Sequence, residues 1–309
     1  MRSEHKKKKK KKRKTFKIIG FTLLILFIGA GAYAASVYQS LAGAIQTMQG
    51  TEHKTDKRVD DIKFKSKDPF SILILGVDER KNDKGRSDTM IVMTVNPKKE
   101  SIELLSLPRD TRTEIIGKGT NDKMNHAYAF GGVSMSINTV EAYLDVPIDY
   151  YVKMNMEGFQ DIVNAVGGVT VDNDMDLAYK GFTFNKGTID LNGKEALIYS
   201  RIRKEDPRGD YGRQMRQRQV IQAVMKKGSS LSTLTNYDDI FKALGKNVET
   251  NLTFNEMLSI QNNYKSSLKN IEQYTLQGDN QRVDGVFYNI VPEDKKLEAQ
   301  NRMKTHLGI

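Results

Sequence analysis

The chain has 309 residues, of which 38% are hydrophobic, and a formal net charge of +11. Eleven of its 49 basic side chains fall in residues 1–17, so the high charge describes a tail and argues against a nucleic-acid-binding domain. There is no cysteine, which excludes disulfides, thiol catalysis and cysteine-ligated metals.

The N-terminus joins a polybasic tail (residues 1–17) to an apolar run. Ile18 to Ala35 holds no charged side chain and, extended to residue 38, is long enough to span a bilayer. The basic flank predicts a single-pass, type II protein of the cell membrane, with a cytoplasmic tail on anionic lipid head groups and the rest outside. A cleaved signal peptide is the alternative, since Ala32-Tyr33-Ala34 resembles a cleavage site, but the run is longer than a typical signal sequence.

The remainder divides into a linker and one domain. Residues 39–68 are polar and charged and are expected to form a stalk. Residues 69–309 are expected to form a single extracytoplasmic domain, which is long enough to bury a core without disulfides.

Three strands should open this domain. Ser71–Val77 is a continuous apolar run, as expected for a strand that is covered on both faces. Thr89–Val95 and Ser101–Leu107 follow, and the turn residues Asn96–Lys99 between them predict a hairpin.

Helices and strands alternate through the rest of the chain. The expected elements are a helix at 133–144, a strand at 150–154, a helix at 157–166, a strand at 169–171, a helix from 192 towards 200, a helix at 210–227, two further helices, and edge strands at 272–276 and 282–290. Asn192 with Glu195, and Thr253 with Glu256, are spaced for capping boxes. This order predicts an α/β fold: a three-layer α/β/α sandwich with a central mixed sheet, preceded by one transmembrane helix.

Six arginines crowd residues 201–218. Arginine stands out here in a chain otherwise rich in lysine, and its planar guanidinium matches two phosphate oxygens at once. Arg213 and Gln217 share a helical stripe with the apolar Val220 and Val224, so both should point inwards, into a pocket.

The same spacing places Arg218 on the opposite, outer side of that helix and Arg216 on its flank. We therefore expect replacement of Arg218 to have little effect. An anion site is favoured for this segment, and a structural network of ion pairs is the alternative.

Carboxylates mark the ends of the expected strands. Asp78 follows the first strand, Asp88 precedes the second and Arg109 follows the third, so the three should converge at one edge of the sheet. Two hard oxygen ligands suit Mg²⁺, and Arg109 would contact a phosphate from the other side. The alternatives are a turn residue for Asp78 and a cap for Asp110.

Together these motifs resemble the LytR–CpsA–Psr family of bacterial cell-envelope proteins, most closely the members that attach wall teichoic acid. The resemblance covers the tail, the span and residues 70 to about 228. The matching segments are Leu75–Arg80, Gly85–Met90, Ser106–Thr111, Lys123–Tyr128 and Tyr199–Arg203, with Asp206, Asp210, Arg213 and Gln217.

The resemblance implies an α/β/α sandwich with a groove for a polyprenyl chain. It implies transfer of a glycopolymer (wall teichoic acid) from undecaprenyl pyrophosphate to the C6 hydroxyl of N-acetylmuramic acid in peptidoglycan. Asp78 and Asp88 would hold Mg²⁺, with Mn²⁺ as an alternative. Asp78, Arg109 and Asp210 would be catalytic, and either aspartate is a candidate for activating the hydroxyl. The pyrophosphate-binding residues would be Arg80, Arg86, Arg109, Arg201, Arg203, Arg213 and Gln217.

Three other functions stay open at this point. A pyrophosphatase could use the same arginines and metal, and a non-catalytic carrier could bind the same lipid. A membrane-bound transcriptional regulator is supported only by the basic tail. Its seven consecutive lysines (residues 6–12) are typical of a topology signal, and no nucleic-acid partner is expected.

Overall fold

The computed structural model describes residues 46–79, 85–230 and 247–309, together with residues 36, 38, 39, 42, 43 and 245. The polybasic tail and the anchor expected at 18–38, apart from Ser36 and Tyr38, lie outside this part of the chain. Within the described part, no helix combines the length and apolar character that a bilayer span requires. The anchor and its orientation therefore stay predictions.

A mixed sheet of the described strands forms the centre of the fold, in the order β11-β6-β1-β2-β3-β12. Its strands are β1 (Phe70–Val77), β2 (Ser87–Asn96), β3 (Ser101–Ser106), β6 (Tyr150–Met154), β11 (Val248–Thr250) and β12 (Asn270–Thr275). Strand β1 runs antiparallel to β2 and parallel to β6, while β3 runs antiparallel to β2 and parallel to β12. The expected central strand and the hairpin that follows it are confirmed.

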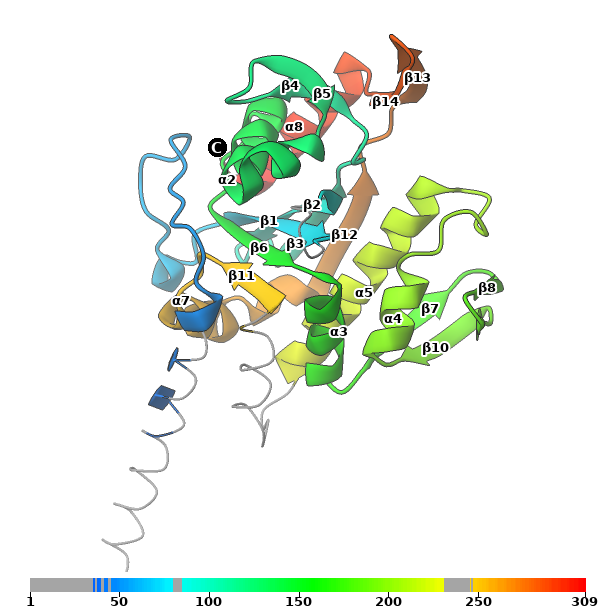
Figure 1. The fold of residues 1–309 in the computed structure, drawn as a ribbon. Helices are drawn as coiled ribbons and strands as arrows, with labels where there is room; N and C mark the ends of the chain where they lie inside the picture. Colours follow the sequence, from blue (N-terminus) through cyan, green and yellow to red (C-terminus); the bar gives the residue numbers. More distant parts are fainter. Residues whose placement is uncertain are drawn as a thin grey trace, which may run out of the picture.

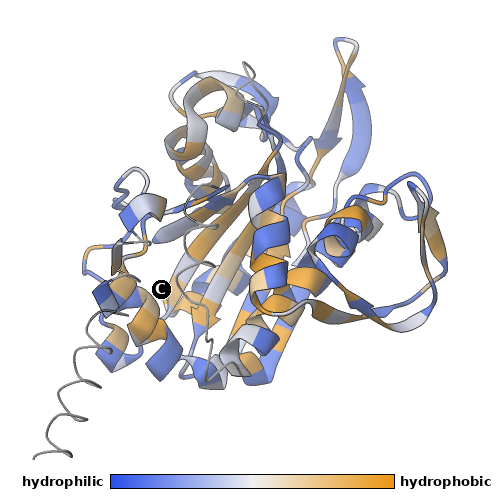
Figure 2. Cartoon of the chain, turned by 60° about the horizontal axis from the view of Figure 1, so that its bottom comes forward, coloured by the Kyte–Doolittle hydropathy of each residue, from blue (hydrophilic) through white to orange (hydrophobic). Residues whose placement is uncertain are grey.

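Helices cover both faces of this sheet (Figure 1). Their bounds are α2 (His126–Leu144), α3 (Met156–Ala165), α5 (Asp210–Ser230), α7 (Phe254–Asn263) and α8 (Glu293–Leu307). Leu73 and Leu75 of β1 share a core with α2 and α8, whereas Ile72 and Ile74 share a second core with α5 and α7. Because side chains alternate along a strand, a continuous apolar run fills both cores. Figure 2 shows the resulting hydrophobic strands between the helical layers. The predicted α/β class with a central mixed sheet is confirmed.

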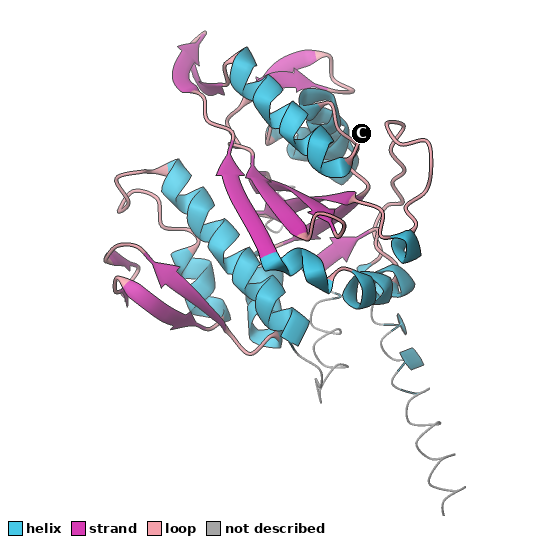
Figure 3. Ribbon diagram, turned by 180° about the vertical axis from the view of Figure 1, so that it is seen from behind, coloured by secondary structure: helices cyan, strands magenta, loops and turns pink. Residues whose placement is uncertain are grey.

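Helix α5 also packs against a small lobe on its other side (Figure 3). The lobe contains β7 (Val169–Asn173), β8 (Leu177–Tyr179), β9 (Phe182–Phe184), β10 (Gly187–Leu191) and α4 (Gly193–Tyr199). Its core includes Val171, Phe184, Tyr199 and, from α5, Val220. Both halves of the expected capping box between Asn192 and Glu195 are present at the start of α4. Helix α5 is therefore enclosed between the sheet and the lobe.

The C-terminal region differs from the prediction. β12 is an edge strand as expected, but residues 282–290 belong to a separate hairpin, β13 (Asp279–Val283) and β14 (Val286–Ile290). Asp284 and Gly285 both have positive φ and make the two-residue turn that an Asp-Gly pair favours. Helix α8 was not predicted, because its buried Ala299, Met303 and Leu307 are isolated among charged residues.

Two further elements refine the expected helices. Helix α2 begins at His126 rather than 133, with a kink at Gly131 and Gly132. The capping box of Thr253 and Glu256 starts α7 as predicted. The helix expected before it falls mainly on residues 231–244, outside the described part of the chain. The structure also adds a hairpin that was not predicted, β4 (Arg112–Ile115) with β5 (Thr120–Lys123).

Candidate active site

Asp78 and Asp88 meet at one end of the antiparallel pair β1 and β2. A β-bulge interrupts the pair at Gly76 and Val77, and just beyond it the backbone N–H of Asp78 donates to the carbonyl of Arg86 at 3.2 Å. Both aspartates line one wall of a cavity of about 550 Å³. Arg86 contributes only its backbone to this turn, because its side chain is exposed and does not line the cavity.

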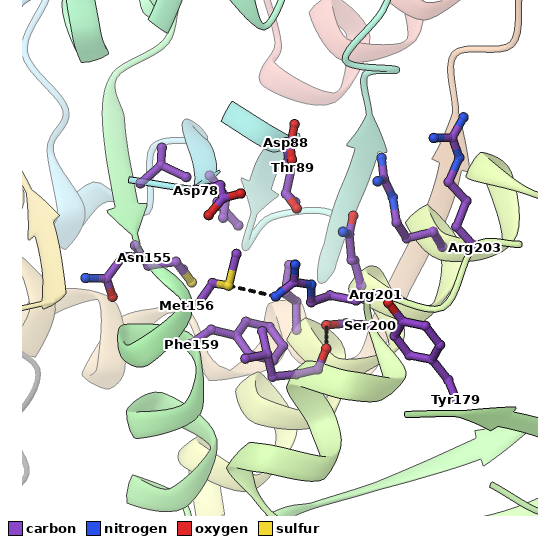
Figure 4. A pocket seen from close by; sticks show the side chains of 18 of the residues that line it. Asp78, Asp88, Thr89, Asn155, Met156, Phe159, Tyr179, Ser200, Arg201 and Arg203 are labelled. Atoms are coloured by element: carbon purple, nitrogen blue, oxygen red, sulfur yellow. Dashed lines mark hydrogen bonds between the residues drawn. The ribbon is translucent and has the colours of Figure 1, made fainter. Parts of the chain in front are cut away.

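The arginine segment forms the facing wall of this cavity (Figure 4). Arg201 and Arg203 come from the loop between α4 and α5, and Arg213 and Gln217 come from the first turns of α5. The inward direction predicted for Arg213 and Gln217 is therefore what the structure shows. In Figure 4 the guanidinium of Arg201 extends into the cavity, where its Nη1 donates to Met156 Sδ at 2.8 Å.

Ion pairs link the charged side chains of this site to one another. Arg109 Nη1 donates to Asp88 Oδ1 at 2.7 Å, which places Arg109 directly behind the cavity wall. Arg213 Nη2 lies 2.6 Å from Asp210 Oδ1, and Arg203 Nε lies 3.6 Å from the same oxygen. Neither contact has hydrogen-bond geometry, so Asp210 Oδ1 is buried without a hydrogen bond from any described residue.

The two buried arginines differ in how far their charge is offset. Burial would lower the pKa of Arg109, but Asp88, Asp110 and Asp210 outweigh it and the pKa is raised. Burial lowers the pKa of Arg213, with Arg109 adding repulsion, and the attraction of Asp210 does not make up the difference. In both side chains Nε is buried and donates to no residue that the structure describes. Such groups are prepared to bind an anion that supplies the missing acceptors.

Apolar side chains also line the cavity, and sequence patterns did not identify them. They are Ile74, Val77, Met154, Met156, Phe159, Leu197 and Ile221. Three of them follow β6 into α3, where Asn155 caps the helix by accepting a hydrogen bond from the Gly158 N–H at 2.8 Å. A cap residue followed by Met156 and Phe159 was the available signal, but it also describes an ordinary core helix. The cavity thus combines charged and apolar lining residues.

The predicted outer positions on α5 are wrong. Arg216 is fully buried: Nη1 donates to Asp206 Oδ2 at 2.5 Å, Nε to the Tyr199 carbonyl at 3.1 Å, and Nη2 to the Ile202 carbonyl at 2.5 Å. Arg218 is 6% exposed and donates to Ser106 and Thr275 of the sheet. Helical spacing gave the direction of each side chain correctly, but the sheet and the lobe bury what would be the outer faces of an isolated helix.

The remaining candidates have local roles or lie outside the described residues. Asp110 pairs with Lys123 at 2.9 Å and stands 3.7 Å from Arg109 Nε, so it supports the site from behind. His126 Nδ1 lies 2.9 Å from Asp122 Oδ2 at the start of α2, a structural contact. Arg80 lies outside the described part of the chain.

Asp78 and Asp88 are the pair on which the predicted metal site depends. Across the described residues, no group of three or more His, Asp or Glu side chains has metal-binding spacing. Two carboxylates on one wall nevertheless suit Mg²⁺, which keeps several waters and takes substrate phosphate oxygens as further ligands. They fit a metal that binds together with a phosphorylated substrate, and not a cage made by the protein alone.

Comparisons with known proteins agree on one family. The LytR_cpsA_psr family model matches residues 34–305. The polyisoprenyl-teichoic acid–peptidoglycan teichoic acid transferase TagU of Bacillus subtilis strain 168 is 49% identical over 308 residues, covering 99% of each chain. The crystal structure of B. subtilis TagU superposes with a TM-score of 0.64 at 50% identity, covering 78% of this chain and 97% of that one. A structure of TagT bound to LIIa-WTA superposes with a TM-score of 0.72 at 33% identity, covering 84% of this chain and 99% of that one.

Proposed function

The chain belongs to the LytR–CpsA–Psr family, and we propose that it is a membrane-anchored teichoic acid transferase. Its donor is a glycopolymer on undecaprenyl pyrophosphate, and its acceptor is the C6 hydroxyl of N-acetylmuramic acid in peptidoglycan. The anchor at 18–38 keeps the catalytic domain at the outer surface of the cell membrane, where a lipid-linked donor and the wall meet. The basic tail lies on anionic lipids at the inner surface.

The observation that carries this proposal is a cavity lined by both charged and apolar side chains. A polyprenyl pyrophosphate is an apolar chain with a compact anionic head. Phe159, Met156 and Leu197 offer an apolar wall for the first isoprene units. Arg201 and Arg213 line the same cavity. One cavity of about 550 Å³ thus suits both parts of the donor's head region.

The reaction is a phosphoryl transfer. The acceptor oxygen forms a bond to the phosphorus that carries the polymer, and the bond from this phosphorus to the bridging oxygen breaks. Polyprenyl phosphate leaves, the hydroxyl proton is lost, and a phosphodiester joins polymer to glycan. Such a transfer needs alignment and neutralisation of charge more than covalent help from the protein. No nucleotide is needed, because the pyrophosphate bond already stores the energy.

The described residues divide these tasks between them. Arg109, Arg201, Arg203, Arg213 and Gln217 bind the pyrophosphate oxygens. The buried Nε atoms of Arg109 and Arg213 are donors that the substrate would engage. Asp210, which has a buried oxygen without a hydrogen bond and lies beside Arg213, is the candidate to accept the hydroxyl proton, with Asp78 as the alternative. Mg²⁺ or Mn²⁺ held by Asp78 and Asp88 would neutralise charge on the phosphates.

A transfer assay tests the proposal. The full chain in detergent micelles receives a polyprenyl-pyrophosphate-linked teichoic acid precursor, peptidoglycan oligomers and Mg²⁺. We expect polymer covalently joined to the glycan, lost on chelation of the metal and lost in Arg213→Ala. Arg282→Ala is the matched control, because this exposed arginine donates only to the carbonyl of Gly285, in the β13–β14 hairpin.

The other outcomes assign other functions. Free phosphorylated polymer without attachment, although acceptor is present, would identify a pyrophosphatase. Binding of the donor without turnover would identify a carrier. Activity that is unchanged in Arg213→Ala would remove the cavity from the mechanism altogether.

A further inference from the structure

Two arginines bridge strands β3 and β12 from opposite faces of the sheet. On the α8 side, Arg302 pairs with two carboxylates, Glu103 of β3 at 3.0 Å and Glu272 of β12. On the α5 side, Arg218 Nη1 donates to two hydroxyls, Ser106 Oγ at 2.5 Å and Thr275 Oγ1 at 2.7 Å. The two arginines thus bridge the same two strands, but only the charge of Arg302 is neutralised by carboxylates.

The surroundings of Arg218 are neutral throughout. The side chains of β3 and β12 on the α5 face include Leu104, Ser106, Gln273 and Thr275, none of which is charged. No described carboxylate lies within 4.0 Å of Arg218, and its buried Nε donates to no described residue. The side chain is 6% exposed, and burial lowers its pKa to about 10.

Such an arginine is costly for the fold alone. A buried charge without a partner opposes folding, and a neutral side chain of similar length would fill the same space. The opposite sheet face shows that this chain can pair an arginine at these strands with carboxylates. We therefore expect the positive charge of Arg218 to have a function, because a carboxylate beside it would have neutralised that charge.

Its position points to the anion site. Ser106 is the last residue of β3, and Arg109 follows three residues later. Arg218 itself lies on α5, next to Gln217 and five residues beyond Arg213, and both of these residues line the cavity. The bond from Arg218 to Ser106 thus joins the two elements that present Arg109 and Arg213. These two side chains repel one another, so their spacing has to be held by the structure around them.

We propose that Arg218 is a positioning residue of the pyrophosphate site: it fixes the end of β3 against α5, so that Arg109 and Arg213 keep their places, and supplies positive charge that no carboxylate offsets. The inference rests on the proposed function, since it assigns Arg218 a role in binding the donor's diphosphate. It does not require Arg218 to touch the substrate.

Binding of geranylgeranyl diphosphate to the full chain in detergent micelles tests this role. We expect Arg218→Met to bind this probe about tenfold more weakly than the wild type, a change that corresponds to about 1.4 kcal/mol. Arg302→Met is the matched control: it removes the arginine that bridges the same strands on the other face, and binding should stay unchanged. Transfer activity, measured in parallel, should show a raised KM for the donor in Arg218→Met only.

The pH profile separates charge from packing. Arg218→Lys keeps a donor and a charge, so it should restore binding at pH 6. Burial lowers the pKa of an ammonium as it lowers that of the guanidinium, so this variant should lose binding as the pH rises, at a lower pH than the wild type. Identical pH profiles for the two proteins would show that Arg218 acts through packing alone. If Arg218→Met does not fold, this profile decides the question.

The failures of the two proposals are distinguishable. A wild-type protein that binds no geranylgeranyl diphosphate would refute the proposed function and the role of Arg218 with it. A wild type that binds the probe, with Arg218→Met binding equally well, would refute only the role of Arg218. Equal weakening in Arg302→Met would refute it too, because strand bridging would then explain both effects.

Discussion

Two groups of arginines lie on different sides of α5 and differ in whether the protein supplies acceptors for their N–H groups. On the lobe side of α5, Arg208 and Arg216 both donate to Asp206, and Arg216 is completed by two backbone carbonyls. On the cavity side, Arg109 and Arg213 each keep a buried Nε that donates to no described residue. The first group has its donors satisfied by the protein, whereas the second keeps donors for a ligand.

The comparison shows that the number and spacing of arginines do not by themselves identify an anion site. The structure divides residues 201–218 between an ion-pair network at Asp206 and a charged cavity wall that includes Arg213, and the anion site at that wall stays a prediction. The two subsets differ in whether the protein supplies an acceptor for each guanidinium N–H group. That depends on tertiary contacts, which arginine spacing does not reveal. Four predictions test this division, beginning with the largest expected effect.

Arg216→Met should destabilise the fold strongly. The substitution leaves the carboxylate of Asp206 buried with Arg208 as its only remaining arginine partner, and breaking a buried pair in this way costs about 3–5 kcal/mol. Urea unfolding followed by circular dichroism measures the change. Transfer activity per folded molecule should stay close to that of the wild type. A variant that is stable but inactive would move Arg216 into the catalytic group.

Arg213→Ala should show the reverse pattern. Loss of one preorganised donor to a developing phosphate charge lowers kcat by about 10²–10³-fold, or about 2.7–4 kcal/mol in the barrier. The free energy of unfolding should not fall, because burial lowers the pKa of Arg213 and its charged form therefore opposes folding. Steady-state kinetics beside urea unfolding of the same sample gives both values. A large loss of stability with normal kcat would show that Arg213 belongs with Arg216.

These two predictions also show how far the sequence leads. Helical spacing placed Arg213 and Gln217 in the cavity, and strand order brought Asp78 and Asp88 together. The wrong assignment of Arg218 has a definite cause: periodicity gives an angle around a helix, but it does not say what covers each angle. The lobe that buries Arg216 is built from strands of three to five residues, β7 to β10, which are too short for a clear alternating pattern. The apolar lining of the cavity has contributions from β1, β6, α3, α4 and α5, and sequence distance hides that convergence.

Acid should weaken the lobe side of α5 through Asp206. Burial would raise the pKa of Asp206, but the hydrogen bonds from Arg208 and Arg216 outweigh it and lower the pKa from 3.8 to about 2. A carboxyl group whose pKa is lowered by folding stabilises the fold at every pH above its unfolded-state pKa. This stabilisation is lost as the pH falls towards the folded-state pKa. The contribution is about 2 kcal/mol, lost between about pH 4 and pH 2. Unfolding in urea across this range should show the slope in the wild type, and Asp206→Asn should lack it. An equal slope in both proteins would place the acid-sensitive group elsewhere.

Arg208→Gln should have the smallest effect, although Arg208 makes more carboxylate contacts than Arg216. Its guanidinium donates to both oxygens of Asp174 at 2.5 and 3.1 Å, and to Asp206. However, its side chain is 33% exposed and that of Asp174 is 46% exposed. Solvent screens such a pair, and water hydrates the remaining charge when its partner is removed. The free energy of unfolding should therefore fall by less than about 1 kcal/mol.

The contrast between Arg208 and Arg216 isolates burial, because both side chains donate to the same carboxylate. Urea unfolding of Arg208→Gln and Arg216→Met under one set of conditions gives the comparison directly. A loss in Arg208→Gln that equals the loss in Arg216→Met would mean that the carboxylate contacts, and not their enclosure, set the cost. The two groups of arginines would then differ only in the carboxylates that they contact. The buried Nε atoms of Arg109 and Arg213 would no longer separate the cavity arginines from the structural ones.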